Sequence, residues 1–205
     1  MLITMSRQFG AGSATVSRMV AQALGWTVVD NEFVDEVARK AGIPAEQVAK
    51  REERAPTFGE RLKRALVADP EVPLIPSAPS ESLDGAKQVK ATEAVVGEIA
   101  AAGRVILVGR AAVAVLARDS KALHVRLVAP RPFRLKIIME RLGVDEKQAL
   151  KALIDTDAHR ARYHRDYYQR DWSDPVNYHM VLNTDALGFT GAADLIVARA
   201  RGLGW

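Results

Sequence analysis

Short apolar runs alternate along the chain with segments in which apolar residues recur at helical spacing. The runs predict strands at residues 2–5, 26–29, 105–108, 123–128 and 180–182. Helices are predicted between and after them, among others at residues 86–102, 111–117 and 190–201. Strands that alternate with helices favour a parallel sheet covered by helices on both faces. The pattern therefore predicts a three-layer αβα fold.

One predicted strand differs from the continuously apolar ones. In residues 123–128, His124 and Arg126 alternate with leucine and valine. Such alternation is typical of a strand with one solvated face, so we expect this strand to be exposed on one side.

Prolines and charged residues dominate the chain between residues 50 and 90. We predict a helical insertion over residues 31–86 with a mobile loop over 69–84. A disordered linker is the alternative, whereas a second full domain would need more residues. The chain, residues 1–205, is therefore expected to form one domain that carries an insertion.

The first 26 residues read as a strand, a glycine loop and a helix in immediate succession. Backbone N–H groups at such a helix N-terminus attract an anion, and the helix dipole adds to the attraction. The sequence departs from the phosphate-loop pattern G-x-x-x-x-G-K-[ST] because Arg7 stands at the first glycine, Ser13 at the lysine and Ala14 at the Ser/Thr. An ordinary strand-to-helix turn is thus the alternative to a phosphate-binding loop.

Two other predicted strand ends carry polar residues. Asp30 follows the strand at 26–29, and Gly109-Arg110 follow the strand at 105–108. Ligands of parallel sheets bind outside the carboxyl ends of the strands. We therefore expect these residues and the Gly10 loop to line one rim of the sheet, which favours a phosphate-binding crevice.

Composition limits the chemistry that the chain can perform. The net charge of +4 over 205 residues suits anionic small molecules and nucleic acid alike. The absence of cysteine excludes disulfides, thiolate metal sites and a cysteine nucleophile. Because no apolar run is long enough to span a bilayer, we expect no membrane association and a cytoplasmic location.

Residues 155–174 (DTDAHRARYHRDYYQRDWSD) concentrate charged and aromatic side chains. They could form a solvated helical face with weak ion pairs. They could instead form a lid whose arginines close over phosphates, since the guanidinium fork pairs bidentately with phosphate oxygens. Aromatics between arginines are also typical of proteins that stack single-stranded nucleic acid, although the modest net charge makes nucleic acid the weaker interpretation.

Several motifs resemble the cytidylate kinase-like proteins of the P-loop nucleoside monophosphate kinase superfamily. These motifs are residues 3–12 (ITMSRQFGAG), Gly109-Arg110, residues 124–130 (HVRLVAP), residues 171–175 (DWSDP) and the stretch from Tyr178 to Asn183-Thr184. The resemblance covers nearly the whole chain. It implies a P-loop kinase fold with a helical insertion that binds the nucleoside monophosphate and an arginine-rich lid over residues 155–174. It further implies phosphoryl transfer from ATP to CMP or dCMP with Mg²⁺, and hence small nucleotides as partners.

The resemblance also implies roles for individual residues. The donor phosphates would be bound by Arg7, Gly10, Ala11, Gly12, Ser13, Ala14 and Thr15. Arg110 would hold the acceptor phosphate, and Asp30 would face the acceptor. The catalytic lid residues would be Asp157, Arg160 and Arg162.

The missing lysine leaves three functional hypotheses open. An active kinase needs another cation at the donor phosphates, for which Arg7, Arg160 and Arg162 are the candidates. A chain without that cation could bind a nucleotide as a regulator and transfer nothing. A binder of single-stranded nucleic acid is the third hypothesis. Because Ala14 lacks the usual hydroxyl, magnesium would be held through Thr15, water or an acidic residue, and no metal site made only of protein groups is expected.

Overall fold

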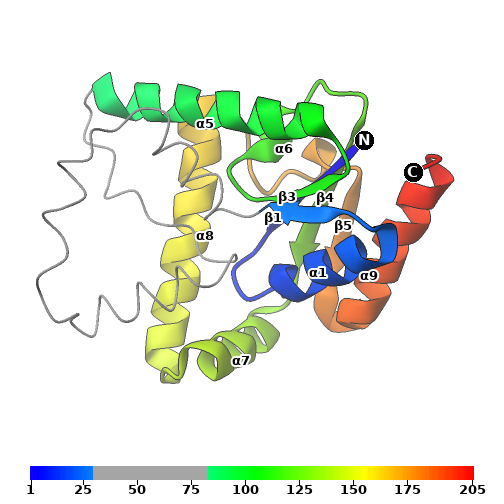
Figure 1. Ribbon diagram of the computed structural model, residues 1–205. Coiled ribbons are helices and arrows are strands. Elements are labelled where there is room, and N and C mark those ends of the chain that lie inside the picture. Colours follow the sequence, from blue (N-terminus) through cyan, green and yellow to red (C-terminus); the bar gives the residue numbers. More distant parts are fainter. Residues whose placement is uncertain (30–82) are drawn as a thin grey trace, which may run out of the picture.

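One parallel sheet forms the centre of the computed structural model, which describes residues 1–29 and 83–205 (Figure 1). Its strands are β1 (Leu2–Arg7), β2 (Thr27–Val29), β3 (Val105–Val108), β4 (Ala122–Val128) and β5 (Met180–Asn183). They lie in the order β2-β3-β1-β4-β5, and every neighbouring pair is parallel. All residues of the central strand β1 are buried, as expected for a strand with a partner on each side and helices above and below.

The helices begin and end close to the predicted positions. They are α1 (Ser13–Leu24), α5 (Leu83–Ala102), α6 (Ala112–Val115), α7 (Arg131–Leu142), α8 (Glu146–Tyr168) and α9 (Thr184–Gly202), with a short 3-10 turn, η1, at Pro175–Asn177. The last helix starts earlier than its apolar pattern indicates. The Asn183 side chain caps its N-terminus, and Gly188, at φ 67°, interrupts the helix before the predicted start.

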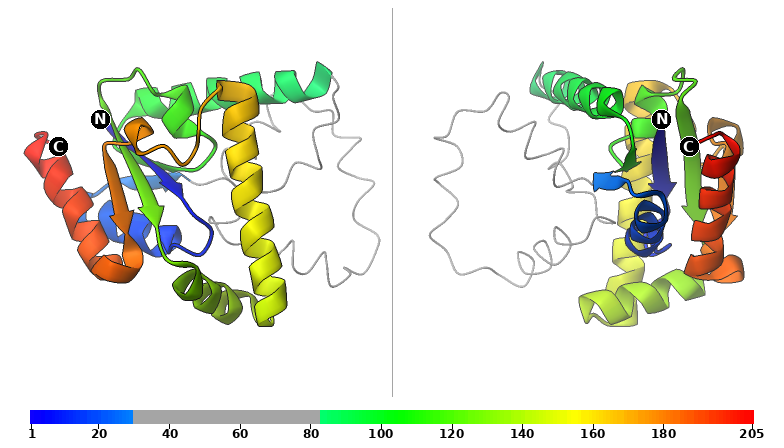
Figure 2. Two further views of the ribbon diagram at one scale, coloured as in Figure 1. Left: turned by 180° about the vertical axis from the view of Figure 1, so that it is seen from behind. Right: turned by 45° about the vertical axis from the view of Figure 1, so that its right-hand side comes forward.

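Two apolar layers cover the two faces of the sheet (Figure 2). Helices α1 and α9 pack on one face, where Val16 and Ile196 meet Ile3. Helix α5 packs on the other face, where Val96 lies in one cluster with Leu107. The predicted three-layer αβα fold with a central parallel sheet is therefore confirmed.

The expectation that one face of β4 is exposed is wrong. His124 and Arg126 are only 4% and 3% exposed. The chain between α8 and β5 covers this face, because Trp172 and Tyr178 lie against Arg126. The guanidinium carbon of Arg126 is 4.0 Å from the centre of the Trp172 ring, and its Nη1 donates to the Tyr178 hydroxyl (3.0 Å) and to the Trp172 carbonyl. The alternation in β4 correctly indicated that one face of the strand carries polar side chains. These side chains lie in a buried polar layer and do not face solvent.

Several predictions fall on residues outside the described part of the chain. Asp30 is one of them, and so is most of the insertion predicted over 31–86 with its loop at 69–84. Both ranges end inside α5, because that helix begins at Leu83. In the ranges that the structure describes, no helix is long and apolar enough to cross a membrane.

Candidate functional site

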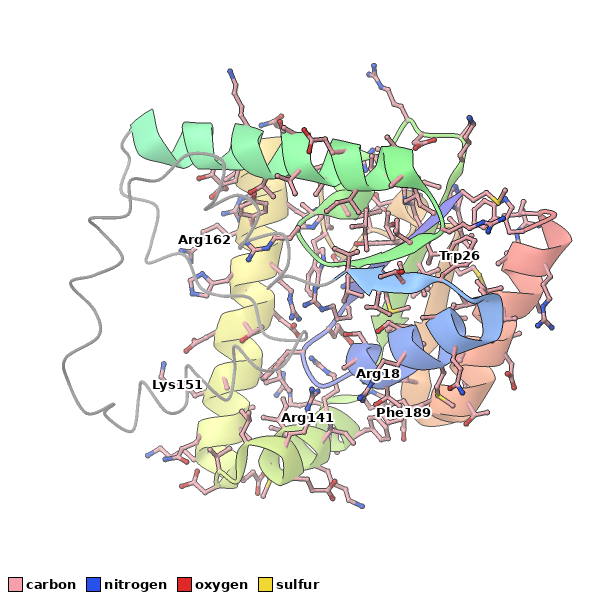
Figure 3. All side chains as sticks on the ribbon, in the orientation of Figure 1. Arg18, Trp26, Arg141, Lys151, Arg162 and Phe189 are labelled. Atoms are coloured by element: carbon pink, nitrogen blue, oxygen red, sulfur yellow. The ribbon has the colours of Figure 1, made fainter. Side chains whose placement is uncertain are left out.

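The turn between β1 and α1 has the geometry of a tight anion-binding loop. Gly10 and Gly12 both adopt left-handed conformations, with φ of 80° and 79°. A Cβ atom on Gly10 would lie 2.8 Å from the carbonyl oxygen of Arg134, and one on Gly12 would lie 2.2 Å from the Phe189 ring. Phe189 belongs to α9, which reaches the loop from the opposite end of the chain (Figure 3). Glycine is therefore required at both positions by conformation and by space.

The first turn of α1 contains one buried polar side-chain atom without a hydrogen-bond partner among the described residues. No side chain caps the helix N-terminus at Gly12. The Oγ atom of Ser13 is buried and has no hydrogen-bond partner in the part of the chain that the structure describes. Leaving a buried hydroxyl unsatisfied costs on the order of 1–3 kcal/mol, so such a group is typical of a site that a ligand completes.

Hydrogen bonds from α1 and α9 hold other residues of the loop in place. Ala11 is fully buried, and its carbonyl oxygen accepts a 3.0 Å hydrogen bond from the Thr184 hydroxyl. The carbonyl oxygen of Ala14 accepts from Arg18 Nε at 3.0 Å. Thr15 is half-buried in the first turn of the helix. The loop is thus anchored by contacts on α1 and α9.

An ion pair between Arg134 of α7 and Asp157 of α8 forms hydrogen bonds with the backbone of the loop. Asp157 Oδ1 accepts the backbone N–H of Phe9 at 2.8 Å, while Asp157 Oδ2 lies 2.6 Å from Arg134 Nη1. Arg134 also donates to the carbonyl oxygen of Phe9 at 3.2 Å. The side chains of Arg134 and Asp157 are 8% and 17% exposed. One largely buried ion pair therefore fixes both backbone polar groups of Phe9, the residue before Gly10.

Arg160 holds the backbone two residues earlier, at Arg7. Its Nη1 donates to the carbonyl oxygen of Arg7 at 2.9 Å and lies 3.4 Å from Asp157 Oδ1. Arg7 itself is 3% exposed. We call Arg134, Asp157 and Arg160 the loop clamp. Two of its members, Asp157 and Arg160, were predicted as lid residues, and the structure places them against the backbone of the loop.

Arg162, the third predicted lid residue, is placed differently. It is exposed on α8 and points away from the sheet (Figure 3). Residues 155–168 of the predicted lid are the second half of α8, and the chain leaves the helix after Tyr168. The structure therefore brings Asp157 and Arg160 to the glycine loop and leaves Arg162 apart from it.

Arg110 lies at the neighbouring strand end, as predicted. The N–H of Gly109 donates to the carbonyl oxygen of Met5 at 3.1 Å, so the end of β3 is beside β1. Arg110 and Ala111 both have positive φ, 51° and 49°, a conformation that non-glycine residues adopt at a cost and that often marks functional sites. Burial raises the pKa of the Tyr163 phenol, and the charge of Arg110 opposes that rise. Arg110 thus faces α8 across the rim of the sheet.

Two features of this region escaped the sequence analysis. Arg134 belongs to the predicted helix after Pro130, but nothing in its spacing separates it from the other basic residues there. The second feature is the strap, residues 169–179, which joins α8 to β5. Trp172 of the strap donates from Nε1 to Ser6 Oγ at 2.9 Å. The strap is thereby fixed to β1 one residue before Arg7.

Metal-binding side chains are sparse near the loop. Within residues 1–29 and 83–205, no three histidine, aspartate or glutamate side chains are grouped closely enough to hold a metal ion. The only carboxylate found in contact with the loop in that part of the chain is Asp157, which the two clamp arginines already neutralise. The Thr15 hydroxyl is the group in the first turn of α1 whose chemistry suits a magnesium ion.

A central parallel sheet with a glycine loop between β1 and α1 defines a P-loop kinase fold. Solved structures agree: an uncharacterized protein from Eubacterium ventriosum superposes with a TM-score of 0.71 at 20% identity, and each chain is 97% covered. Shikimate kinase from Bacteroides thetaiotaomicron superposes with a TM-score of 0.52 at 15% identity, covering 99% of this chain and 97% of that one. These similarities concern the fold.

Comparison of sequences identifies the family to which the chain belongs. The model of the cytidylate kinase-like family matches residues 2–186, and the chain belongs to that family. It is 24% identical over 199 residues to the cytidylate kinase of Methanocaldococcus jannaschii and 22% identical to that of Methanococcus aeolicus. In both comparisons the match covers 96% of this chain and 95% of the relative.

Proposed function

We propose that this protein transfers a phosphoryl group from ATP to a nucleoside monophosphate, with CMP or dCMP as the acceptor. Family membership supports the reaction class, and the cytidylate kinases among the relatives support the choice of acceptor. The observation that carries the proposal is the buried, unpartnered Oγ of Ser13 in the uncapped first turn of α1. A donor phosphate at this turn would satisfy the hydroxyl and could also accept from backbone N–H groups at the helix N-terminus.

The chain's own residues can divide the work of phosphoryl transfer between them. In this proposal, residues 10–15 bind the donor phosphates and Arg110 holds the acceptor phosphate. Arg162, exposed on α8, would approach the phosphates only if the helix or its side chain moved. Asp30, outside the described residues, would face the acceptor. Positioning of the two phosphates in line is the main contribution that such an enzyme makes.

The loop clamp supplies positive charge where the lysine is missing. Arg134 and Arg160 carry two positive charges against the single negative charge of Asp157. Both guanidinium groups lie next to the loop and are largely shielded from solvent, with side chains 8% and 9% exposed. Loss of a preorganised charge contact can cost about 3–4 kcal/mol of transition-state stabilisation. We propose that Arg160 provides this contact in place of the lysine.

Magnesium fits the site only in part. When bound with ATP, Mg²⁺ would supply positive charge that offsets the negative charge developing on the phosphates. The Thr15 hydroxyl is the protein ligand that this proposal assigns to it, and water and phosphate oxygens would complete its shell. The residues of this chain that act on the phosphates directly are thus hydroxyls, backbone N–H groups and arginines.

A regulator that binds a nucleotide without turnover is the second candidate. It is favoured by Ser13 and Ala14, which replace the lysine and the hydroxyl of the phosphate-loop pattern. Binding of single-stranded nucleic acid has less support. Trp172, one of the aromatics on which that hypothesis depends, is 6% exposed and lies under Arg126.

Coupled turnover assays with magnesium-ATP and each of CMP, dCMP, UMP and AMP test the proposal. We expect turnover with CMP or dCMP. Arg110→Ala should lower kcat/KM at least about tenfold, because a hydrogen bond to a charged group contributes about 1.5–3 kcal/mol. Arg118→Ala, at an exposed arginine after α6, is the matched control. Absence of turnover with all four acceptors would reject the kinase, and a nucleotide-induced rise in Tm without turnover would favour the regulator.

A further inference from the structure

A small cavity lies on the far side of the sheet from α1. Its volume is about 100 Å³, and it is enclosed by His124 of β4 and by strap residues that include Arg170, Asn177 and His179. His124 is paired with Thr4, three residues before the end of β1. At roughly 3.3 Å per residue, the cavity is about 10 Å along the sheet from the start of the glycine loop. It is therefore separate from the proposed phosphate site.

The only arginine, lysine, aspartate or glutamate among the described residues that line this cavity is Arg170. Arg170 is half-buried, and its guanidinium makes no ion pair or hydrogen bond with the residues that the structure describes. None of the described lining residues is acidic. Arg126, in the layer behind, donates hydrogen bonds to a carbonyl and a phenol, and its charge contributes to lowering the pKa of the exposed Asp171. Two carboxylates lie nearby but outside the lining. Asp119, whose charge raises the pKa of His124, accepts the N–H of Lys121, and Asp171 accepts from the N–H and hydroxyl of Ser173.

The two imidazoles at the cavity cannot supply a negative charge. Burial is the largest cause of the lowering of the pKa of His124 to about 4. The backbone N–H of His124 donates to Nδ1 of His179 at 2.9 Å, and the two rings stack at 5.0 Å. Because Nδ1 of His179 accepts a hydrogen bond, its proton is on Nε2. The wall thus offers donors, the guanidinium of Arg170 and the Nε2–H of His179.

Buried and half-buried charges in proteins are normally paired. A cavity with a guanidinium, an imidazole N–H and no acid is the complement of an anion. A volume of about 100 Å³ is well below the roughly 300–1,000 Å³ of a pocket for a nucleotide-sized ligand, so only a ligand of a few non-hydrogen atoms fits. We propose that this cavity binds a small oxyanion of the size of inorganic phosphate, with Arg170 as its charged donor. This inference is independent of the proposed kinase function.

The four histidines of the chain provide reporters for a test with inorganic phosphate. The full-length protein is titrated with sodium phosphate at pH 7.5 and constant ionic strength, and the imidazole Cε1–H resonances are followed by NMR. His124 and His179 report the cavity, whereas His159, next to Arg160 in the sequence, reports the loop clamp. We expect saturable shifts of the His124 and His179 resonances. Sodium chloride at the same ionic strength should leave both unchanged.

Variants distinguish this site from the glycine loop and from general charge effects. Arg170→Met removes the guanidinium, keeps most of the side-chain stem and should raise the phosphate midpoint at His179 at least about tenfold. Arg199→Met, at an exposed position in the last turn of α9, removes the same charge elsewhere and should change nothing. Circular dichroism melts establish that both variants are folded. Unchanged His124 and His179 resonances in the wild type, or an unchanged midpoint in Arg170→Met, would overturn the proposal. Shifts confined to His159 would also overturn it.

Discussion

Replacing Asp157 by asparagine should destabilise the protein more than any other single-charge change on α8. Asp157 lies between the largely buried guanidinium groups of Arg134 and Arg160, at 2.6 and 3.4 Å, and accepts the N–H of Phe9. The amide keeps an acceptor for Phe9 but removes the negative charge that both arginines contact. Removing one partner of a buried ion pair costs about 3–5 kcal/mol, and the retained acceptor places Asp157→Asn near 3 kcal/mol.

Thermal unfolding followed by circular dichroism measures this cost. For a chain of this size about 1 kcal/mol corresponds to about 2–4 °C in Tm, so we expect a decrease of roughly 6–12 °C. Asp155→Asn is the matched control two residues earlier. Asp155 is 46% exposed and pairs with Lys151, which is 78% exposed, at 2.7 Å. Such surface pairs contribute about 0.3–0.5 kcal/mol. Equal shifts in Tm for Asp157→Asn and Asp155→Asn would refute the loop clamp as a structural element.

Three further changes test other parts of the structure. Burial lowers the pKa of His124 and of His164 from 6.5 to about 4, so the unfolded chain binds protons that the folded chain excludes. The contribution of these histidines to the free energy of unfolding should be fully present above pH 6.5 and fall by up to about 3 kcal/mol per histidine as the pH is lowered to 4. When Tm is measured against pH, His164→Gln should make the decline shallower. Gly12→Ala should destabilise the protein, and less so when Phe189→Ala removes the ring that its Cβ would meet; additive changes in a double-mutant cycle would contradict this. Trp172→Phe should cost about 1 kcal/mol in urea unfolding, because it keeps the ring over the guanidinium but loses the buried indole N–H bond; an unchanged midpoint would show that this bond contributes nothing.

The layers and the sheet could be predicted from the sequence because each element carries its own local signal. The runs at 105–108 and 180–182 are short and apolar, and glycines end several helices. The burial of β4 could not be predicted in the same way. Whether His124 and Arg126 face solvent depends on the strap, which covers them from more than 40 positions further along the chain.

The candidate site shows the same division between local and long-range information. The glycine loop and the strand end at Arg110 are sequence-local features, and the structure places them on neighbouring strands. Arg134 gave no signal, because its importance comes from contacts with Phe9 and Asp157, which are 125 and 23 positions away along the chain. Arginines on a helix surface look alike in sequence. Only the fold distinguishes the buried Arg160 from the exposed Arg162.

The loop clamp changes how the missing lysine can be understood. A lysine in the loop would deliver a mobile point charge from the end of a flexible side chain. In this protein the positive charge next to the loop comes from guanidinium groups that also hold the backbone of Arg7 and Phe9. The same side chains therefore determine both the shape of the loop and the electric field around it. A substitution in the clamp should consequently alter stability and anion affinity together, whereas loss of a lysine from a conventional loop would alter affinity alone.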